Sequence, residues 1–165
     1  MRAIQDESIG AARPALERAL LYMMVMRPVE SVGRERPMAR QDASAHWFRS
    51  DAHTYVAESD GRIVGTYILR ANQLGPGSHV ANAAFMVAPN AQGQGIGRAM
   101  GEHCLKEARR LGFRAMQFNF VVSTNESAIR LWQRLGFEIV GTLPEAFRHP
   151  EMGYVDVHVM FRSLL

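Results

Sequence analysis

Apolar positions recur with two different periods along the chain, and these periods divide it into expected helices and strands. Apolar residues spaced by three or four positions, as on one face of a helix, occur in the segments 8–23, 42–48, 96–111 and 126–135. β-Rich runs that predict strands occur in the segments 1–5, 53–58, 62–69, 80–87, 114–122, 137–142 and 154–161. We therefore expect an α/β fold with about seven strands and about four helices.

The connections between the expected strands set their directions. Asp60-Gly61 lies between the segments 53–58 and 62–69 and is a hairpin signal, which makes this pair antiparallel. The segments 80–87 and 114–122 are joined through a helix, and such a crossover makes two strands parallel. The sheet is thus expected to be mixed and mostly antiparallel, with one central parallel pair.

Three local features of the second half lead to further predictions. Asn119 lies inside a near-continuous apolar run, so its amide is expected to be buried and to need a partner or a ligand. Ser123 and Glu126 have the spacing of a capping box at the start of the following helix. The segment 143–153 contains prolines and predicts a loop.

The main candidate for chemistry is the glycine loop 92–97, Gln-Gly-Gln-Gly-Ile-Gly, which follows a strand and opens a helix. Glycine has no side chain to keep a ligand away from the backbone. The first N–H groups of a helix lack intrahelical partners and carry partial positive charge. Such a loop binds phosphate or pyrophosphate without a lysine, although an ordinary glycine-rich turn has the same composition.

Two common phosphate-binding motifs do not fit this loop. A P-loop requires Lys and then Ser or Thr after its last glycine, whereas Arg98 and Ala99 follow Gly97. A dinucleotide-binding fingerprint requires G-x-G-x-x-G, and Gly95, Gly97 and Gly101 miss that spacing by one residue. Both classes of protein are therefore disfavoured.

Composition and charge limit the kind of protein further. The 165 residues, 47% hydrophobic and 21% charged, fit a single globular domain, residues 1–165. With neither a long apolar run nor a signal-peptide pattern, we expect no membrane contact and a cytoplasmic location. A net charge of +3 with dispersed arginines argues against a nucleic-acid partner. Cys104 is the sole cysteine and the histidines lack metal-site spacing, so neither a disulfide nor a metal is expected.

Two segments resemble motifs of the GCN5-related N-acetyltransferase (GNAT) family. Gln92-x-x-Gly95-x-Gly97, after a strand that ends in Val-Ala-Pro, is similar to the family's acetyl-coenzyme A (acetyl-CoA) motif, Q/R-x-x-G-x-G/A. The segment 125–137 is similar to the family's N-x-x-A-x-x-L-Y-x-x-x-G-F. The resemblance covers roughly residues 50–165. It implies a GNAT-like sheet whose central parallel pair is splayed at the acetyl-CoA site.

The resemblance also implies how acetyl-CoA, as cosubstrate, is bound. Backbone groups of three strand residues would pair with the pantetheine arm, and an amide near the last of them would stabilise the oxyanion. The N–H groups of the glycine loop and of the first helical turn would hold the pyrophosphate. The implied cofactor-binding residues are Phe85, Met86, Val87, Gln92, Gly93, Gln94, Gly95, Ile96, Gly97, Arg98 and Asn125.

The sequence departs from the family where the acid and base usually lie. Trp132 stands where the family usually has a tyrosine that protonates the leaving thiolate, and an indole has no ionisable proton. The strand 80–87 lacks the glutamate that often acts as the base. The resemblance therefore leaves the proton-transfer groups unassigned.

A closer resemblance is to fungal N-acetyltransferases that act on L-azetidine-2-carboxylate and other proline-like amino acids. It is carried by the segments 79–83 and 118–125 and implies that Asn82, Asn119 and Asn125 are the catalytic residues that bind and orient the acceptor. From the residues alone, Asn125 is also an adequate helix cap, and Asn82 an adequate bulge residue.

These observations favour an acetyl-CoA-dependent N-acetyltransferase whose acceptor is the amine of a small molecule. The alternatives are a protein or peptide N-acetyltransferase and a non-catalytic sensor of acyl-CoA. A homodimer is compatible with the resemblance.

Overall fold

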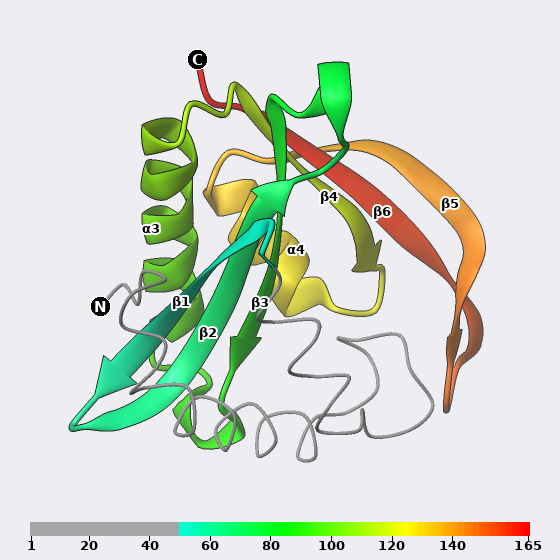
Figure 1. Ribbon diagram of the computed structural model, residues 1–165. Coiled ribbons are helices and arrows are strands. Elements are labelled where there is room, and N and C mark those ends of the chain that lie inside the picture. Colours follow the sequence, from blue (N-terminus) through cyan, green and yellow to red (C-terminus); the bar gives the residue numbers. More distant parts are fainter. Residues whose placement is uncertain (1–49) are drawn as a thin grey trace.

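Six strands form one mixed sheet in the computed structural model, which describes residues 50–165 (Figure 1). Their order across the sheet is β1-β2-β3-β4-β6-β5. The strands are β1 (Ala52–Ser59), β2 (Arg62–Ala71), β3 (Val80–Val87), β4 (Ala115–Val122), β5 (Glu138–His149) and β6 (Gly153–Ser163). The predicted strand 1–5 and the predicted helices 8–23 and 42–48 lie outside the described residues.

The predicted strand directions are confirmed. β1 and β2 are antiparallel around a tight turn in which Asp60 and Gly61 have positive φ angles of 50° and 71°, the geometry of a type I′ hairpin. β3 and β4 are parallel, and the crossover between them contains α3 (Ile96–Arg110). The α/β class and the central parallel pair are therefore as expected.

The parallel pair is short. The β3–β4 ladder consists of Val80 opposite Ala115 and Ala81 opposite Met116. Past these pairs the two strands diverge, and α4 (Glu126–Arg134) lies in the region between them (Figure 1). The sheet thus opens at the carboxyl end of β3, where the glycine loop begins.

Both described helices pack on the same face of the sheet. Met100, Cys104 and Trp132 from the helices join one apolar core with side chains of the strands. Gly101 allows α3 to approach α4 closely, because a Cβ atom there would lie 2.5 Å from Leu135 Cδ1. Cys104 is fully buried, as expected of a small apolar residue. Among the described residues, no helix has the length and apolar character that a membrane crossing requires.

Two local predictions are wrong. The expected loop 143–153 is mostly strand, because β5 continues to His149 and accommodates Pro144 at an irregularity between Leu143 and Phe147. The expected capping box at Ser123 does not begin α4: the N-cap is Asn125, whose side chain accepts the Ala128 N–H.

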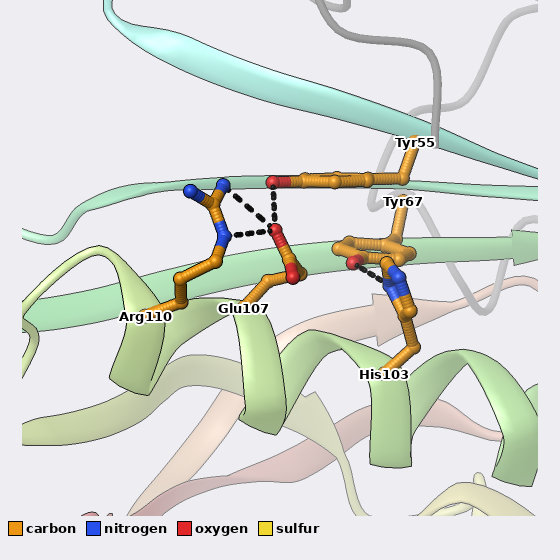
Figure 2. Close-up of polar contacts among 5 residues, drawn as sticks. All are labelled: Tyr55, Tyr67, His103, Glu107 and Arg110. Atoms are coloured by element: carbon orange, nitrogen blue, oxygen red, sulfur yellow. Dashed lines mark hydrogen bonds and ion pairs between the residues drawn. The ribbon is translucent and has the colours of Figure 1, made fainter. Parts of the chain in front are cut away.

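A polar cluster joins α3 to the first two strands (Figure 2). The Tyr55 hydroxyl donates to Glu107 Oε2 at 3.0 Å, and Arg110 Nε donates to the same oxygen at 2.9 Å. Beside them, the Tyr67 hydroxyl lies 2.6 Å from His103 Nδ1. The two tyrosine rings stack with centroids 4.7 Å apart. These hydrogen bonds therefore hold α3 against β1 and β2, whose contact with the helix is otherwise mostly apolar.

Electrostatics within this cluster favour an ionised Glu107. The hydrogen bond from Arg110 holds the pKa of the Glu107 carboxyl below its ordinary value, against the opposing effect of burial. Burial, together with the neighbouring carboxylate, raises the pKa of Tyr55 to about 12. Burial lowers the pKa of His103, which favours the neutral ring.

Replacing Glu107 with Gln tests this cluster. At pH 7 we expect the free energy of unfolding to fall by about 1–2 kcal/mol, because the amide oxygen of glutamine still accepts a hydrogen bond but the acceptor is no longer charged. A lowered folded-state pKa stabilises the protein above the carboxyl pKa of the unfolded chain, and that stabilisation disappears as pH falls through the folded-state pKa. Denaturant titrations at pH 7 and pH 3 should therefore show the difference between variant and wild type shrinking in acid.

Glu102→Gln is the matched control, because Glu102 lies on the same helix in an exposed pair with Arg98 at 2.8 Å. We expect it to change stability by no more than about 0.5 kcal/mol. A Glu107→Gln effect that stays constant with pH would contradict the assignment.

Candidate functional site

A cleft of about 750 Å³ lies where β3 and β4 diverge. Its walls come from β3, the glycine loop, the start of α3, β4 and α4. The lining residues are Asn82, Ala83, Ala84, Phe85, Val87, Ala91, Gln92, Gly93, Gly95, Ile96, Gly97, Arg98, Phe118, Asn119, Phe120, Val121, Val122, Asn125, Ser127, Ala128, Leu131 and Trp132. The two segments that carry the sequence motifs therefore meet across one cavity.

The glycine loop forms one end of the cleft. Gly93 and Gly95 have φ angles of 75° and 79°, and a Cβ atom on either would meet nothing within 4 Å, so their backbones are open to a ligand. In α3, the Ala99 N–H donates to Gly95 O at 3.0 Å. The N–H groups of Ile96 and Gly97 precede this helical bond, where N–H groups remain available for a ligand. This arrangement suits an anion such as a pyrophosphate.

Most of the residues expected at the cofactor line the cleft, but Met86 and Gln94 do not. The Met86 side chain is buried, since alternate residues of a strand point to opposite faces. The Gln94 side chain donates to Asn90 O at 3.0 Å. Arg98 lines the cleft while its guanidinium pairs with Glu102.

Aromatic rings form the wall between the two open strands. Trp132 from α4 lies 4.8 Å from Phe85 and 4.7 Å from Phe118, measured between ring centroids. With 8% of its surface exposed, Trp132 packs as a side chain of the core as well as lining the cleft. The ring at the position of the family tyrosine is thus a packing element without an acid proton.

Arg98 is the one ionisable side chain among the described residues that line the cleft. Within residues 50–165 there is also no group of three or more His, Cys, Asp or Glu that suits a metal ion. The polar side chains of the lining are mainly amides, which bind and orient a ligand by hydrogen bonds but do not exchange protons near neutral pH.

Asn119 is exposed in the cleft, so the expectation that it is buried is wrong. The reason is the divergence of β3 and β4 together with an irregularity between Phe118 and Val121 in the pairing of β4 with β6. The expectation that its amide needs a partner holds: Asn119 Nδ2 donates to Asn72 Oδ1 at 2.7 Å, and Gln117 Nε2 donates to Asn119 Oδ1 at 2.8 Å.

The three predicted asparagines line the same cleft but are held differently. Asn82 Nδ2 donates to Asn72 Oδ1 at 3.0 Å, so Asn82 and Asn119 share one partner. Asn125 instead caps α4, and its Oδ1 accepts from the Ala128 N–H at 3.2 Å and from Ser127 Oγ at 3.0 Å. Asn82 and Asn119 are therefore linked through Asn72, whereas Asn125 caps α4.

Sequence reasoning missed Asn72, which lies between the predicted strands 62–69 and 80–87. The signal that could have found it is the β2–β3 register, in which Ala71 lies opposite Ala81. Asn72 is the next residue, and its N–H donates to Val80 O at 2.8 Å. This places Asn72 two positions after Arg70, the residue that lies opposite Asn82.

Comparison with known proteins gives the family. The model of the acetyltransferase (GNAT) family matches residues 20–137. N-acetyltransferase aca1 of Schizosaccharomyces pombe is 38% identical over 98 residues, which are 59% of this chain and 47% of that protein. Mycothiol acetyltransferase of Saccharomonospora viridis is 29% identical over 108 residues, 62% of this chain and 35% of that protein. The chain thus covers less than half the length of each of these two relatives.

Solved structures extend the likeness to nearly the whole chain. A GCN5-related N-acetyltransferase from Kribbella flavida has a TM-score of 0.79 and 39% identity, with 98% of this chain and 95% of that one covered. The putative acetyltransferase yncA of Salmonella typhimurium, solved with its cofactor acetyl-CoA, shares the fold with a TM-score of 0.73 and 22% identity, over 99% and 92% of the two chains. The expected resemblance to the GNAT family is confirmed, and the protein belongs to the acetyltransferase (GNAT) family.

Proposed function

We propose that the protein is an acetyl-CoA-dependent N-acetyltransferase that acts on the amine of a small molecule. The observation that carries the proposal is the single cleft in which the open N–H groups of the glycine loop face the same cavity as the amides of Asn82 and Asn119. One end suits a pyrophosphate and the other suits a polar acceptor. Family membership and a structural neighbour solved with acetyl-CoA support this assignment.

In the proposed complex, the backbone of the chain does most of the cofactor binding. The loop from Gln92 to Arg98 holds the pyrophosphate by N–H groups, and the open edge of β3 from Phe85 to Val87 pairs with the pantetheine arm. When bound, acetyl-CoA supplies the acetyl group as a thioester. An N–H donor near Val87 stabilises the oxyanion, and one such donor contributes ~2.7–4 kcal/mol in other enzymes.

Asn82 and Asn119 would bind and orient the acceptor amine for attack on the thioester carbon. The attack forms a C–N bond and breaks the C–S bond, and coenzyme A leaves as a thiolate. An ammonium form must lose one proton before it can attack, and the nitrogen loses a further proton as the amide forms. Because the described lining offers no carboxylate, imidazole or phenol, we propose that the amine arrives neutral or loses its first proton to water, and that the further proton passes through water to the thiolate. Asn125 is proposed to act at the cofactor and acceptor through its position at the start of α4.

A proline-like cyclic amino acid is the proposed acceptor class. Amides carry both donors and acceptors, so a pair of them matches an amine and a neighbouring carboxylate without a fixed charge. We propose that residues 1–165 form one N-acetyltransferase domain that works in the cytoplasm. We propose no metal and no nucleic-acid partner, and a homodimer is compatible with the proposal.

The same amide-lined cleft also favours a second candidate, a non-catalytic sensor that binds acyl-CoA. Such a protein needs the glycine loop but needs neither an acid nor a base. The first experiment therefore has to separate binding from transfer.

That experiment measures release of the coenzyme A thiol from acetyl-CoA with a panel of amines. The panel contains L-azetidine-2-carboxylate, proline analogues, simple primary amines and a peptide with a free N-terminus and a lysine. We expect release above the acceptor-free rate with the cyclic amino acids, because the cleft amides can orient both their polar groups. Binding of acetyl-CoA without thiol release for any amine would support the sensor, and release only with the peptide would overturn the small-molecule acceptor.

Gly95→Ala tests the glycine loop. A side chain at a φ of 79° costs ~1–2 kcal/mol of backbone strain, and its Cβ would enter the space proposed for the pyrophosphate. We expect calorimetry to show acetyl-CoA binding about tenfold weaker, a loss of ~1.4 kcal/mol. Gly112→Ala is the control, because Gly112 has a φ of 84° and an equally open Cβ position but lies beyond the far end of α3. Equal weakening by both variants would mean that the loop acts only through folding.

Asn119→Ala tests the acceptor end. We expect turnover to fall about tenfold, as for loss of one well-placed hydrogen bond, with nearly unchanged affinity for acetyl-CoA. Steady-state kinetics and calorimetry on the same sample measure the two quantities. Gln133→Ala, which removes an exposed amide on α4 outside the cleft, should change neither. Loss of cofactor binding in Asn119→Ala would point to a folding role for this residue instead.

A further inference from the structure

Four side-chain amides form a continuous hydrogen-bonded chain beside the cleft. Gln117 donates to Asn119, Asn119 donates to Asn72, and Asn82 donates to the same oxygen of Asn72. We call these four residues the amide chain. Asn82 and Asn119 line the cleft, whereas Asn72 contacts it only through them. Asn72 is thus the junction between the two proposed acceptor-binding side chains.

Asn72 is itself held firmly by the backbone. It directly follows the Ala71–Ala81 pair of the β2–β3 ladder, and its N–H donates to Val80 O at 2.8 Å. Its residue surface is only partly exposed. The main chain of Asn72 is thus fixed, and its Oδ1 accepts from both Asn82 and Asn119.

The side-chain oxygen of Asn72 determines the orientation of the Asn82 and Asn119 amides. An amide has a carbonyl oxygen on one side and an NH₂ group on the other, and a half-turn about the last torsion exchanges them. Asn72 Oδ1 accepts but cannot donate, so a half-turn of Asn82 or Asn119 would bring two carbonyl oxygens together. With Asn72 Oδ1 facing both of them, the amide chain selects one orientation for Asn82 and one for Asn119.

The selected orientations leave complementary groups for a ligand. Among the four amides, all of which the structure describes, Asn82 Oδ1 takes no part in the chain, and the NH₂ groups of Asn82 and Asn119 each use only one of their two protons in it. Asn82 thus keeps an acceptor for an amine N–H, and Asn119 keeps a donor for a carboxylate or carbonyl oxygen. A flipped Asn82 would present N–H groups to the N–H groups of the amine.

We propose that Asn72 is a positioning residue that fixes Asn82 as a hydrogen-bond acceptor and Asn119 as a donor, which selects acceptor amines that carry a neighbouring carboxylate. This inference rests on the proposed acetyl transfer to a small amine. Asn72 acts through its two neighbours and does not touch the reacting atoms.

The kinetic test compares Asn72→Ala with Asn72→Asp. Alanine removes the shared acceptor, while aspartate keeps an acceptor-only oxygen of the same size. With L-azetidine-2-carboxylate as the probe, Asn72→Ala should lower kcat/KM for the amine about two- to tenfold for each hydrogen bond lost, with KM for acetyl-CoA unchanged. Asn72→Asp should lie nearer wild type. In an Asn82→Ala background the effect of Asn72→Ala should shrink, since one of the two side chains through which it acts is gone.

A spectroscopic test needs no turnover. The side-chain NH₂ protons of Asn82 and Asn119, observed by ¹⁵N-edited NMR, should exchange slowly with solvent in wild type and in Asn72→Asp, and lose this protection in Asn72→Ala. Unprotected signals in wild type, or an unchanged pattern in Asn72→Ala, would overturn the positioning role. Absence of turnover by wild type with every amine would instead overturn the proposed function, and with it the selection of acceptors, even where the NMR pattern is as expected.

Discussion

The separation of β3 and β4 after two residue pairs is the constraint on which the rest of the site depends. A parallel ladder that continued past Ala81 and Met116 would close the space that now holds the cleft. It would also leave Asn119 inside the sheet and occupy the backbone groups of β3 that are proposed to bind the pantetheine arm. The opening is kept by packing, because Trp132 contacts Phe85 on one strand and Phe118 on the other. Trp132, which stands where the family usually has a tyrosine, therefore helps to hold the cleft open.

An aromatic row connects this opening to the polar cluster under α3. Tyr55, Tyr67 and Phe85 stand on adjacent strands and stack in sequence, with centroids 4.7 Å and 5.2 Å apart, and Phe85 then meets Trp132. The first two rings are anchored at their hydroxyls by Glu107 and His103 of α3 (Figure 2). α3 begins at the glycine loop, and further along its length it is held by Tyr55 and Tyr67. The same row of aromatic rings ends at the wall of the cleft. Rigid placement of binding groups is what allows a site to hold two reactants in register.

The sequence predicted those features that depend on local pattern. The strand 80–87, the crossover helix and the glycine loop follow from apolar spacing and glycine positions, and the structure has all three. Pro144 led to the wrong prediction of a loop, because a proline inside a β-rich segment usually ends a strand. β5 pairs with β6 and tolerates Pro144 where this pairing is irregular. The contact between Asn119 and Asn72 was beyond prediction for another reason. Their contact spans 47 positions in the sequence and exists only because β3 and β4 diverge, and no local pattern encodes that divergence.

The irregularity of β5 has a consequence for how molecules of this protein meet one another. Within residues 50–165, β5 lies at the end of the strand order, so one side of its backbone faces away from β6. An uninterrupted outer strand is a template onto which a second polypeptide can add by hydrogen bonding, the first step of amyloid-like assembly. Here Pro144 removes one donor and Glu145, with a φ of 51°, turns the backbone out of the extended form. The long outer strand is thereby divided into two short ones, which protects a strand with exposed Val140 and Leu143 against self-association.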